Sequence, residues 1–257
     1  MGIYLKEFST HSEYEQYING SGAILPNVSI CTTEGDVHYN PYVPYVDPCA
    51  SEKVKTTYEW VEIGGVKWAT KNVGAKTITD YGQYFSWGGV NGFTADQVTG
   101  GCKVFSWADY ELGNGMSSAS DMTKYNSTDG KTVLESVDDA ATANMGSGWR
   151  MPTSAEFQAL GTATTSAWTS SYEGSGVAGL VCTDKTDSSK TLFFPACGYC
   201  LEGSVNLVGT YDRYWSSSLY NGNVLYAYDL DSIVNGYVNW QGYSQRYYGF
   251  PVRGVVG

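Results

Sequence analysis

The stretch Gly148-Trp-Arg-Met-Pro-Thr-Ser-Ala-Glu156 carries the clearest fold signal of the sequence, the start of a helix. Thr153 and Glu156 have the spacing of a capping box. In that motif the threonine hydroxyl and the glutamate carboxylate each accept a hydrogen bond from a backbone N–H group that the first turn leaves unpaired. Phe157 and Leu160 follow at the spacing of an apolar stripe. The sequence therefore predicts an amphipathic helix that begins after Thr153.

A second short helix is predicted over residues 137–145, ahead of Gly146. Its acidic pair, Asp138 and Asp139, lies in the first turn, where the helix dipole favours negative charge. The other signals are short apolar or β-branched runs between turn residues, with Gly64-Gly65 as a hairpin turn. These runs predict strands over 60–63, 66–69, 179–182, 191–195, 224–230, 238–240 and 252–256. The pattern indicates an α+β fold with two short helices and small antiparallel sheets.

Residues 1–40 are predicted to form a small N-terminal module for attachment or assembly. A capping box at Thr10 and Glu13 predicts a short helix, and two runs around a turn at 34–36 predict a hairpin. Residues 41–56 contain several prolines, which favour an extended linker. Residues 57–257 then form the main domain.

Composition and charge exclude several classes of function. The 257 residues carry a net charge of −11 with only 15 Lys and Arg residues. This balance argues against nucleic-acid binding, because phosphate contacts need a basic patch. No run approaches the roughly 18 apolar residues of a membrane span, so membrane insertion is not expected. No apolar signal-peptide segment is visible after Met1.

Residues 211–250 have the composition of a binding surface. They hold nine of the chain's 22 tyrosines, together with many Asn, Ser, Gly and Asp residues. Tyrosine offers a large amphipathic contact area with few rotatable bonds, and the small polar residues supply adaptable hydrogen bonds. Lysine is absent after Lys190 and glutamate after Glu202, as is typical of interface cores. The alternative is that several of these residues are ordinary strand tyrosines.

The motifs of the main domain, taken in order, resemble a known family. They are Trp68-Ala-Thr-Lys-Asn-Val-Gly74, Tyr81-Gly-Gln-Tyr-Phe-Ser-Trp-Gly88, Asp138-Asp-Ala-Ala141, Gly148-Trp-Arg-Met-Pro-Thr153, Phe194-Pro-Ala196, Tyr214-Trp-Ser-Ser217 and Gly249-Phe-Pro-Val-Arg253. Their joint order resembles the paralogous surface domain of Bacteroidetes and their phages, which is similar in fold to C-type lectins and to the formylglycine-generating enzyme. Some members are variable proteins of diversity-generating retroelements, in which mutation of template adenines rewrites C-terminal codons. The resemblance implies a C-type lectin-like domain with a variable region of about 211–253.

Adenine mutation gives a criterion for separating variable from fixed positions. AAC and AAT codons mutate to Tyr, Asn, Asp, Ser and Gly codons, among others, but not to Trp or Gln codons. The positions expected to be fixed on this ground are Trp215, Trp240, Gln241 and Gln245. The positions expected to hold the fold are Trp149, Arg150, Trp215, Ala227, Leu230, Trp240 and Arg253. The candidate ligand-binding residues are Tyr220, Asn221, Asn223, Tyr226, Tyr228, Asp229, Asp231, Asn235, Tyr237, Asn239, Tyr243, Tyr247 and Tyr248.

The cysteines and aspartates leave sharper alternatives open. The six cysteines are interpreted as buried free thiols, and they are Cys31, Cys49, Cys102, Cys182, Cys197 and Cys200. The Cys197–Cys200 pair has the spacing of a redox motif or of half a zinc site with Cys102 and Cys182. Some aspartates suit calcium, as in many lectins, although solvated loop aspartates are the preferred interpretation. These aspartates are Asp184, Asp187, Asp229 and Asp231.

No feature of the main domain indicates catalysis. The histidines, His11 and His38, both belong to the N-terminal module, which excludes a Ser/His/Asp triad from residues 57–257. The formylglycine-generating enzyme uses copper and a reactive cysteine pair near its C-terminus, whereas no cysteine follows Cys200 here. We therefore expect no catalytic residue, no metal and no cofactor.

These observations favour a ligand-binding protein, not an enzyme. The resemblance implies a phage tail protein that determines tropism by binding a protein or glycan of the bacterial surface, and it implies a location in the virion. Segments 18–20, 25–29 and 37–41 also resemble structural proteins of Bacteroides phages. The alternatives are an adhesin or glycan-binding lectin displayed on the bacterial surface and, more distantly, an oxidase of the formylglycine-generating type. Tail receptor-binding proteins are often trimers, so a homotrimer is one expected assembly.

Overall fold

The computed structural model describes residues 47–50, 56–114 and 121–257. The chain divides into two units, residues 1–50 and 51–257. The helix and hairpin predicted for residues 1–40 lie outside the described residues, as does the linker 41–56 apart from 47–50 and 56. Within 47–50, the amide of Ala50 donates to the carbonyl oxygen of Asp47 at 3.0 Å and closes a turn.

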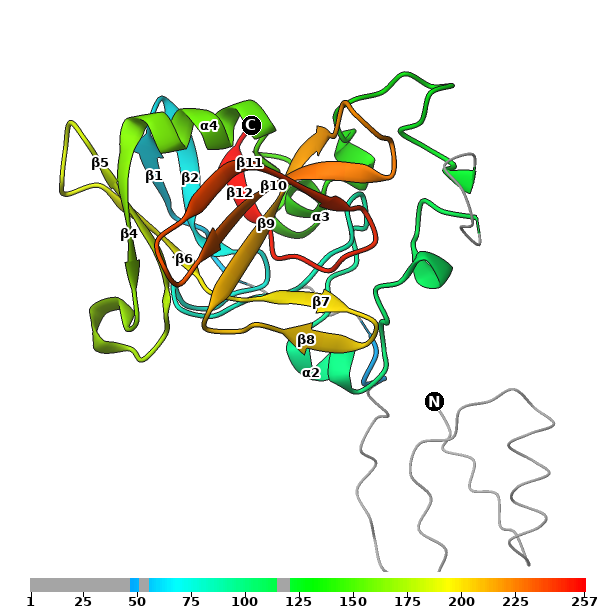
Figure 1. The fold of residues 1–257 in the computed structure, drawn as a ribbon, viewed down its shortest axis with the longest axis horizontal. Helices are drawn as coiled ribbons and strands as arrows, with labels where there is room; N and C mark the ends of the chain where they lie inside the picture. Colours follow the sequence, from blue (N-terminus) through cyan, green and yellow to red (C-terminus); the bar gives the residue numbers. More distant parts are fainter. Residues whose placement is uncertain (1–46, 51–55, 115–120) are drawn as a thin grey trace, which may run out of the picture. The chain divides into compact units, whose positions relative to one another are not determined.

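The second unit is an α+β structure with a few short helices and several small antiparallel sheets (Figure 1). A four-stranded sheet contains, in spatial order, β1 (Trp60–Ile63), β2 (Val66–Asn72), β12 (Arg253–Val256) and β3 (Trp149–Arg150). A three-stranded sheet contains β4 (Thr164–Thr169), β5 (Gly179–Asp184) and β6 (Thr191–Pro195). Another contains β11 (Val238–Gln245), β10 (Tyr226–Ile233) and β9 (Tyr211–Leu219), and a hairpin contains β7 (Tyr199–Leu201) and β8 (Ser204–Asn206).

The predicted helix after Thr153 is confirmed as α4 (Ser154–Ala163), with both hydrogen bonds of its capping box present. The helix predicted over 137–145 divides into a 3₁₀ turn, Ser136–Asp138, and α3 (Ala140–Met145), because Asp139 is itself the N-cap. The expectation of two helices is too low, because the described residues also contain α2 (Ala95–Thr99), which begins after a capping box at Thr94. Further 3₁₀ turns span Trp107–Asp109 and Tyr172–Gly174. Within the described ranges, no helix has the length and apolarity needed to cross a membrane.

Arg253 joins the two ends of this unit. It lies on β12, which pairs with β2, and its side chain is fully buried. The guanidinium donates to Oδ1 of Asn72 at 2.7 and 3.0 Å, to the Ala69 carbonyl at 3.0 Å and to the Phe193 carbonyl at 2.8 Å. A buried cation needs such a full set of acceptors. The predicted structural role of Arg253 is therefore confirmed.

Of the other residues expected to hold the fold, Trp215, Ala227 and Leu230 lie in the core. Trp215 is fully buried, stacks on Phe250 with ring centroids 4.2 Å apart, and donates from Nε1 to the Phe85 carbonyl at 2.9 Å. Ala227 and Leu230 are fully buried. Burial of one large apolar side chain stabilises a fold by about 1.5–3 kcal/mol. Trp149 and Arg150 are half-buried, and Arg150 pairs with Glu156 at 2.5 Å across the start of α4.

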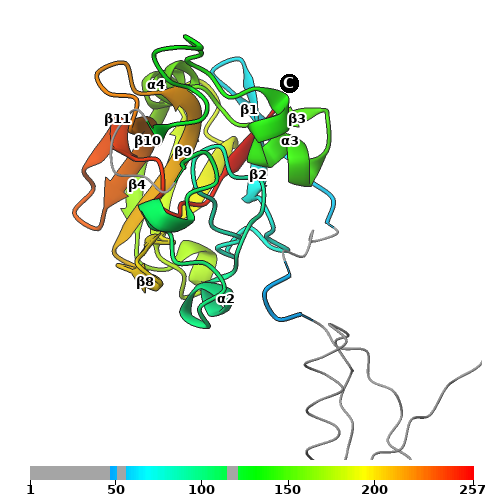
Figure 2. The same cartoon turned by 90° about the vertical axis from the view of Figure 1, so that its right-hand side faces the viewer.

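The sheet β9–β10–β11 packs against α4 (Figures 1 and 2). The closest approach is at Gly161, where a Cβ atom would lie 2.6 Å from the Trp240 ring. Trp240 is half-buried and packs against the core beneath. At the far ends of these strands, Leu219 is buried, whereas Tyr226 and Gln245 are half-buried.

The cysteines differ in state. Cys182, Cys197 and Cys200 are free and buried, as predicted. The prediction of free thiols is wrong for Cys49 and Cys102, which are disulfide-bonded. Spacing along the chain gives no measure of how far apart two cysteines lie after folding, which is why the sequence did not reveal this. Cys31 lies outside the described residues.

Candidate ligand-binding surface

The candidate contact residues differ in exposure. The exposed ones are Asn221, Asn223, Asn235, Tyr237 and Tyr243. The half-buried ones are Tyr220, Tyr226, Tyr228, Asp231, Asn239 and Tyr248. Asp229 and Tyr247 are buried, so the prediction that these two side chains lie on an exposed surface is wrong. Most of the predicted rings are thus accessible, and the candidates lie in several separate places.

One place is an aromatic group at the ends of β9, β10 and β11. We call Tyr220, Tyr226, Tyr228 and Tyr243 the tyrosine cluster. Tyr228 and Tyr243 are cross-strand partners. Tyr220 stacks on Tyr243 with centroids 4.2 Å apart and planes 12° apart, and it meets Tyr228 edge-on at 5.2 Å. Tyr226 meets Tyr243 edge-on at 5.9 Å. Edge-on aromatic pairs contribute about 0.5–1.5 kcal/mol beyond their area.

A tight turn between β9 and β10 brings Tyr220 into this cluster. The amide of Tyr220 donates to the Tyr226 carbonyl at 3.0 Å, and the Asn223 side chain accepts from the Leu225 amide at 2.9 Å. Asparagine side chains stabilise such turns by replacing a backbone acceptor. The ring of Tyr220 lies over Gly222, where a Cβ atom would be 2.6 Å from it. The turn residues therefore fix the position of the half-buried Tyr220 ring.

Carboxamide groups border the tyrosine cluster. The Tyr228 hydroxyl donates to Oδ1 of Asn221 at 3.1 Å, and Nε2 of Gln245 donates to the Tyr226 hydroxyl at 3.4 Å. Asn221 and Asn223 are both exposed. Each of these amides keeps further donors or acceptors beyond the bond named. The surface thus combines fixed aromatic rings with hydrogen-bonding groups at their edge.

Arg246 supports the turn from beneath. It is fully buried, and its Nη1 donates to the Val224 carbonyl at 3.0 Å and to the Tyr125 carbonyl at 3.1 Å. Its Nε donates to the Tyr110 hydroxyl at 2.8 Å, and its Cζ lies 4.6 Å from the centre of the Trp87 ring. Sequence reasoning missed this residue, because no local pattern distinguishes it from a surface arginine.

The second place is an acidic pair on β10. Carboxylate oxygens of Asp229 and Asp231 lie 2.2 and 2.4 Å from the position that a Cβ atom would take on Gly242 of β11. Asp229 is 1% exposed, and neither of its oxygens has a hydrogen-bond partner among the described residues. Burial raises the pKa of Asp229 to about 7, and the positive charge of Arg213 opposes this shift. Burial also raises the pKa of Asp231.

Arg213 and Tyr211 complete the polar group around this pair. Arg213 is the cross-strand partner of Asp231, and it donates to the Tyr211 hydroxyl at 2.9 Å and to the Ser244 hydroxyl at 2.6 Å. Asn239 donates to Asp231 at 3.2 Å. Neither Tyr211 nor Arg213 is among the predicted contact residues. The register of β9 against β10, which pairs Arg213 with Asp231 and Tyr211 with Ile233, is the signal that would have revealed them.

The remaining candidates lie elsewhere. Tyr247 and Tyr248 pack on each other at 4.8 Å, and Tyr247 lies 4.5 Å from Trp107. Asn235 and Tyr237 form the turn after β10. That turn follows Ile233, whereas the tyrosine cluster lies at Tyr226, and about 3.3 Å per residue separates the two by roughly 23 Å. The structure therefore does not bring all candidates into one surface.

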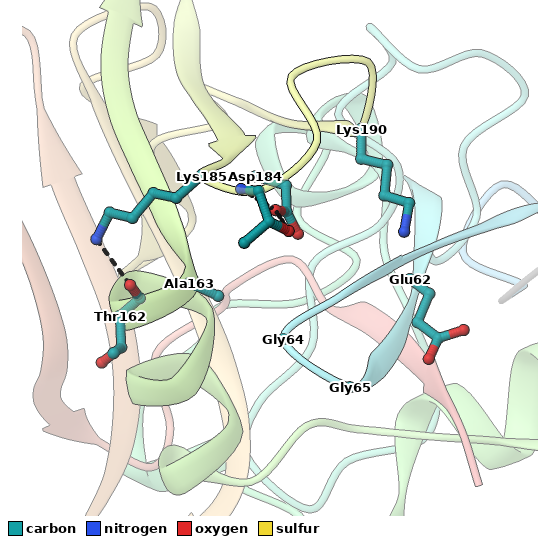
Figure 3. Close-up of a pocket in the computed structure, with 9 residues that line it drawn as sticks. Glu62, Gly64, Gly65, Thr162, Ala163, Asp184, Lys185 and Lys190 are labelled. Carbon is teal, nitrogen blue, oxygen red and sulfur yellow. Dashed lines mark hydrogen bonds between the residues drawn. The ribbon is translucent and has the colours of Figure 1, made fainter.

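A pocket of about 440 Å³ lies between the β1–β2 turn, the end of α4 and the β5–β6 turn (Figure 3). Two lysines line the pocket, Lys185 and Lys190. The Lys185 side chain donates to the Thr162 carbonyl at 2.7 Å, and its backbone amide donates to the Ala163 carbonyl at 3.0 Å. Cations at a helix C-terminus satisfy its last carbonyls and its dipole. Lys185 thus stabilises the C-terminal end of α4. None of the lining residues belongs to β9, β10 or β11.

The described residues hold no group of three or more His, Cys, Asp and Glu side chains that could bind a metal ion. Asp184 accepts from the Thr186 amide at 2.7 Å and Asp187 from the Ser189 amide at 3.1 Å, so both stabilise turns. The interpretation of Asp229 and Asp231 as solvated loop residues is wrong, because both lie on β10, where Asp229 is buried and Asp231 is half-buried.

The zinc alternative loses one of its four ligands, because Cys102 is disulfide-bonded. Burial raises the pKa of Cys182 and of Cys197 to about 12, which disfavours the thiolate that binds metals. Neither cysteine therefore has the environment of a reactive or metal-binding thiol.

A scan against models of protein families found no match to this chain, and searches of curated proteins and of solved structures likewise returned none.

Proposed function

We propose that the chain is a ligand-binding protein, not an enzyme, and that residues 57–257 form a C-type lectin-like domain. The observation that carries the proposal is the tyrosine cluster, a set of accessible rings held by the backbone turn, by one another and by strand pairing. Fixed rings lose little conformational entropy on binding, which is how affinity-matured paratopes gain affinity.

We propose further that the ligand is a receptor on the bacterial cell surface and that the chain is the variable, tropism-determining protein of a phage tail. The order of sequence motifs supports this identity. The alternation within β9–β11 also supports it, since buried Trp215, Ala227 and Leu230 hold the sheet while accessible Tyr and Asn residues lie between them. Exposed positions of this kind tolerate substitution with small effects on stability.

Display on the bacterial surface as an adhesin is the alternative location. The disulfide-bonded Cys49 and Cys102 support a position outside the reducing cytosol, which both locations satisfy. A reverse-transcriptase gene beside a near-identical template repeat that differs at adenines would favour the phage or retroelement assignment. A lipoprotein signal upstream of the chain in the gene would favour the adhesin.

Binding of the labelled full chain to intact cells of a panel of Bacteroidetes strains, measured by flow cytometry, tests the function. We expect at least one strain to bind the wild type, and Tyr243→Ser to lower binding at least tenfold. Tyr243 is 53% exposed and Trp60 on β1 is 48% exposed, so Trp60→Ser is the matched control and is expected to bind as wild type. Absence of binding to every strain, or equal binding by Tyr243→Ser, would contradict the proposal.

A further inference from the structure

The strands and the turn that carry the tyrosine cluster hold few charged residues. Between Leu219 and Gln245 the ionisable carboxylates are those of Asp229 and Asp231, and the segment has no Lys, Arg, Glu or His. Asp229 is buried, and Asp231 is half-buried beside Arg213. The rings of the cluster therefore present their faces, hydroxyls and neighbouring amides to solvent without a net charge.

The lysines of the adjoining segment, Lys124 and Lys131, are paired with carboxylates. Thr132 and Val133 lie beside the end of β9, through hydrogen bonds and a bridge to Leu219 and Ser218. The next charged residue, Lys131, pairs with Glu135 at 2.7 Å. Among the described residues next to the cluster, an anionic ligand would find no unpaired cation to replace its hydration. The cost of leaving its charge unpaired excludes it from a tight site.

The geometry suits a ring with one apolar face and polar edges. Tyr243 is the most exposed member of the cluster, and its stacking on Tyr220 holds its ring in place. A fixed aromatic face offers apolar contact. Donors and acceptors come from the exposed amides of Asn221, which bonds to Tyr228, and of Asn223 in the same turn. A sugar ring has this complementary character, with C–H groups on one face and hydroxyls around it.

We propose that the ligand of the tyrosine cluster is an uncharged glycan, bound by stacking on Tyr243 and by hydrogen bonds to the neighbouring carboxamides. This inference rests on the proposed function. A protein partner fits less well, because a stable protein interface takes about 20–30 residues a side. Such interfaces favour arginine among their central contacts, and the nearest arginines, Arg213 and Arg246, are engaged within the domain.

The test uses the same cell-binding assay with cells treated in two ways. Periodate cleaves the vicinal diols of sugars, and protease removes surface proteins. We expect periodate to lower wild-type binding at least tenfold and protease to change it less than twofold. Binding should also change less than twofold between 0.1 and 1 M NaCl, because no ion pair contributes. Tyr243→Phe, which keeps the ring, should retain binding within threefold, whereas Tyr243→Ser should lose it.

The outcomes separate the two proposals. Binding that depends on Tyr243, survives periodate and is lost after protease would leave the proposed function intact and overturn the glycan inference. Sensitivity to periodate combined with a tenfold loss in 1 M NaCl would indicate an anionic glycan and would also overturn it. Binding that is absent, or that does not depend on Tyr243, would overturn the proposed function itself. Thermal unfolding of each variant shows that a loss of binding does not reflect a loss of fold.

Discussion

Asp229 and Gly242 face each other across β10 and β11 so closely that a Cβ atom on Gly242 would lie 2.2 Å from a carboxylate oxygen of Asp229. Asp231 approaches the same point from two residues further along β10, at 2.4 Å. The absent side chain at Gly242 thus leaves the room that the acidic pair occupies. Since Tyr243 follows directly in the chain, the packing of the acidic pair and the position of the tyrosine cluster are linked through β11.

Gly242→Ala is expected to destabilise the domain by about 1–3 kcal/mol, the usual cost of overpacking a filled site. The added Cβ atom meets the carboxylate ends of Asp229 and Asp231, and because Asp229 is buried its carboxylate has little room to move aside. Binding through the adjacent Tyr243 should fall as well. Urea unfolding measures the first effect. Gly148→Ala is the control, because nothing lies within 4 Å of its added Cβ atom, and equal stability of the two variants would contradict the prediction.

Asp229→Asn is expected to stabilise the domain at pH 8 and to change its stability little at pH 4. The folded pKa of Asp229 is about 7, above the ordinary value of 3.8, so the folded state binds more protons than the unfolded state between these values. The stability that the protonated carboxyl contributes is therefore present below pH 4 and is lost as pH rises through 7, by at most about 4 kcal/mol.

The measurement for Asp229→Asn is the free energy of unfolding from pH 4 to 8. Burial also raises the pKa values of Asp212 and Asp231, so the variant should reduce the slope without abolishing it. Asp187→Asn is the control. Hydrogen bonds from Ser189 lower the pKa of Asp187, and its removal should produce no gain at pH 8. An unchanged slope in Asp229→Asn would show that this carboxyl is not the titrating group.

Local chemistry in the sequence predicted local structure well. A few adjacent residues specify the capping box at Thr153 and Glu156 and the turn at Gly64-Gly65. Both features are present in the structure. The helix α2 has the same kind of signal at Thr94 and Gln97. It was missed because its five residues are too few to show a helical period.

The exposure of charged residues could not be predicted in the same way. Ala227 was expected to be buried, and strand alternation places Asp229 on the same face, yet the polar character of aspartate suggested exposure. What buries Asp229 is the approach of Gly242 from another strand. The burial of Arg246 likewise requires the carbonyl groups of Tyr125 and Val224 as acceptors. No sequence pattern predicts that these two carbonyl groups come together in the fold.

Arg246→Lys is expected to destabilise the domain by about 2–5 kcal/mol. A lysine ammonium cannot reproduce the several directed bonds of the guanidinium, and it leaves buried carbonyl oxygens unpaired. The turn that holds Val224 should loosen, and binding through the tyrosine cluster should weaken with it. Thermal unfolding measures the effect on stability.

Arg150→Lys is the control for Arg246→Lys. Arg150 is 39% exposed in its pair with Glu156, so its loss should cost less than about 1 kcal/mol. Similar losses in the two variants would contradict the role assigned to Arg246.

Gly161→Ala separates helix propensity from packing, because the two effects have opposite signs at this position. Alanine stabilises a helix interior by about 1 kcal/mol relative to glycine, but its Cβ atom would lie 2.6 Å from the Trp240 ring that packs on α4. We expect the clash to dominate and the variant to lose about 1–3 kcal/mol. In a Trp240→Ala background the ring is gone, so the same substitution should become stabilising by about 0.5–1 kcal/mol. Urea unfolding of the four proteins measures this coupling, and a stabilising Gly161→Ala in the presence of Trp240 would mean that α4 and β11 do not pack as closely as described.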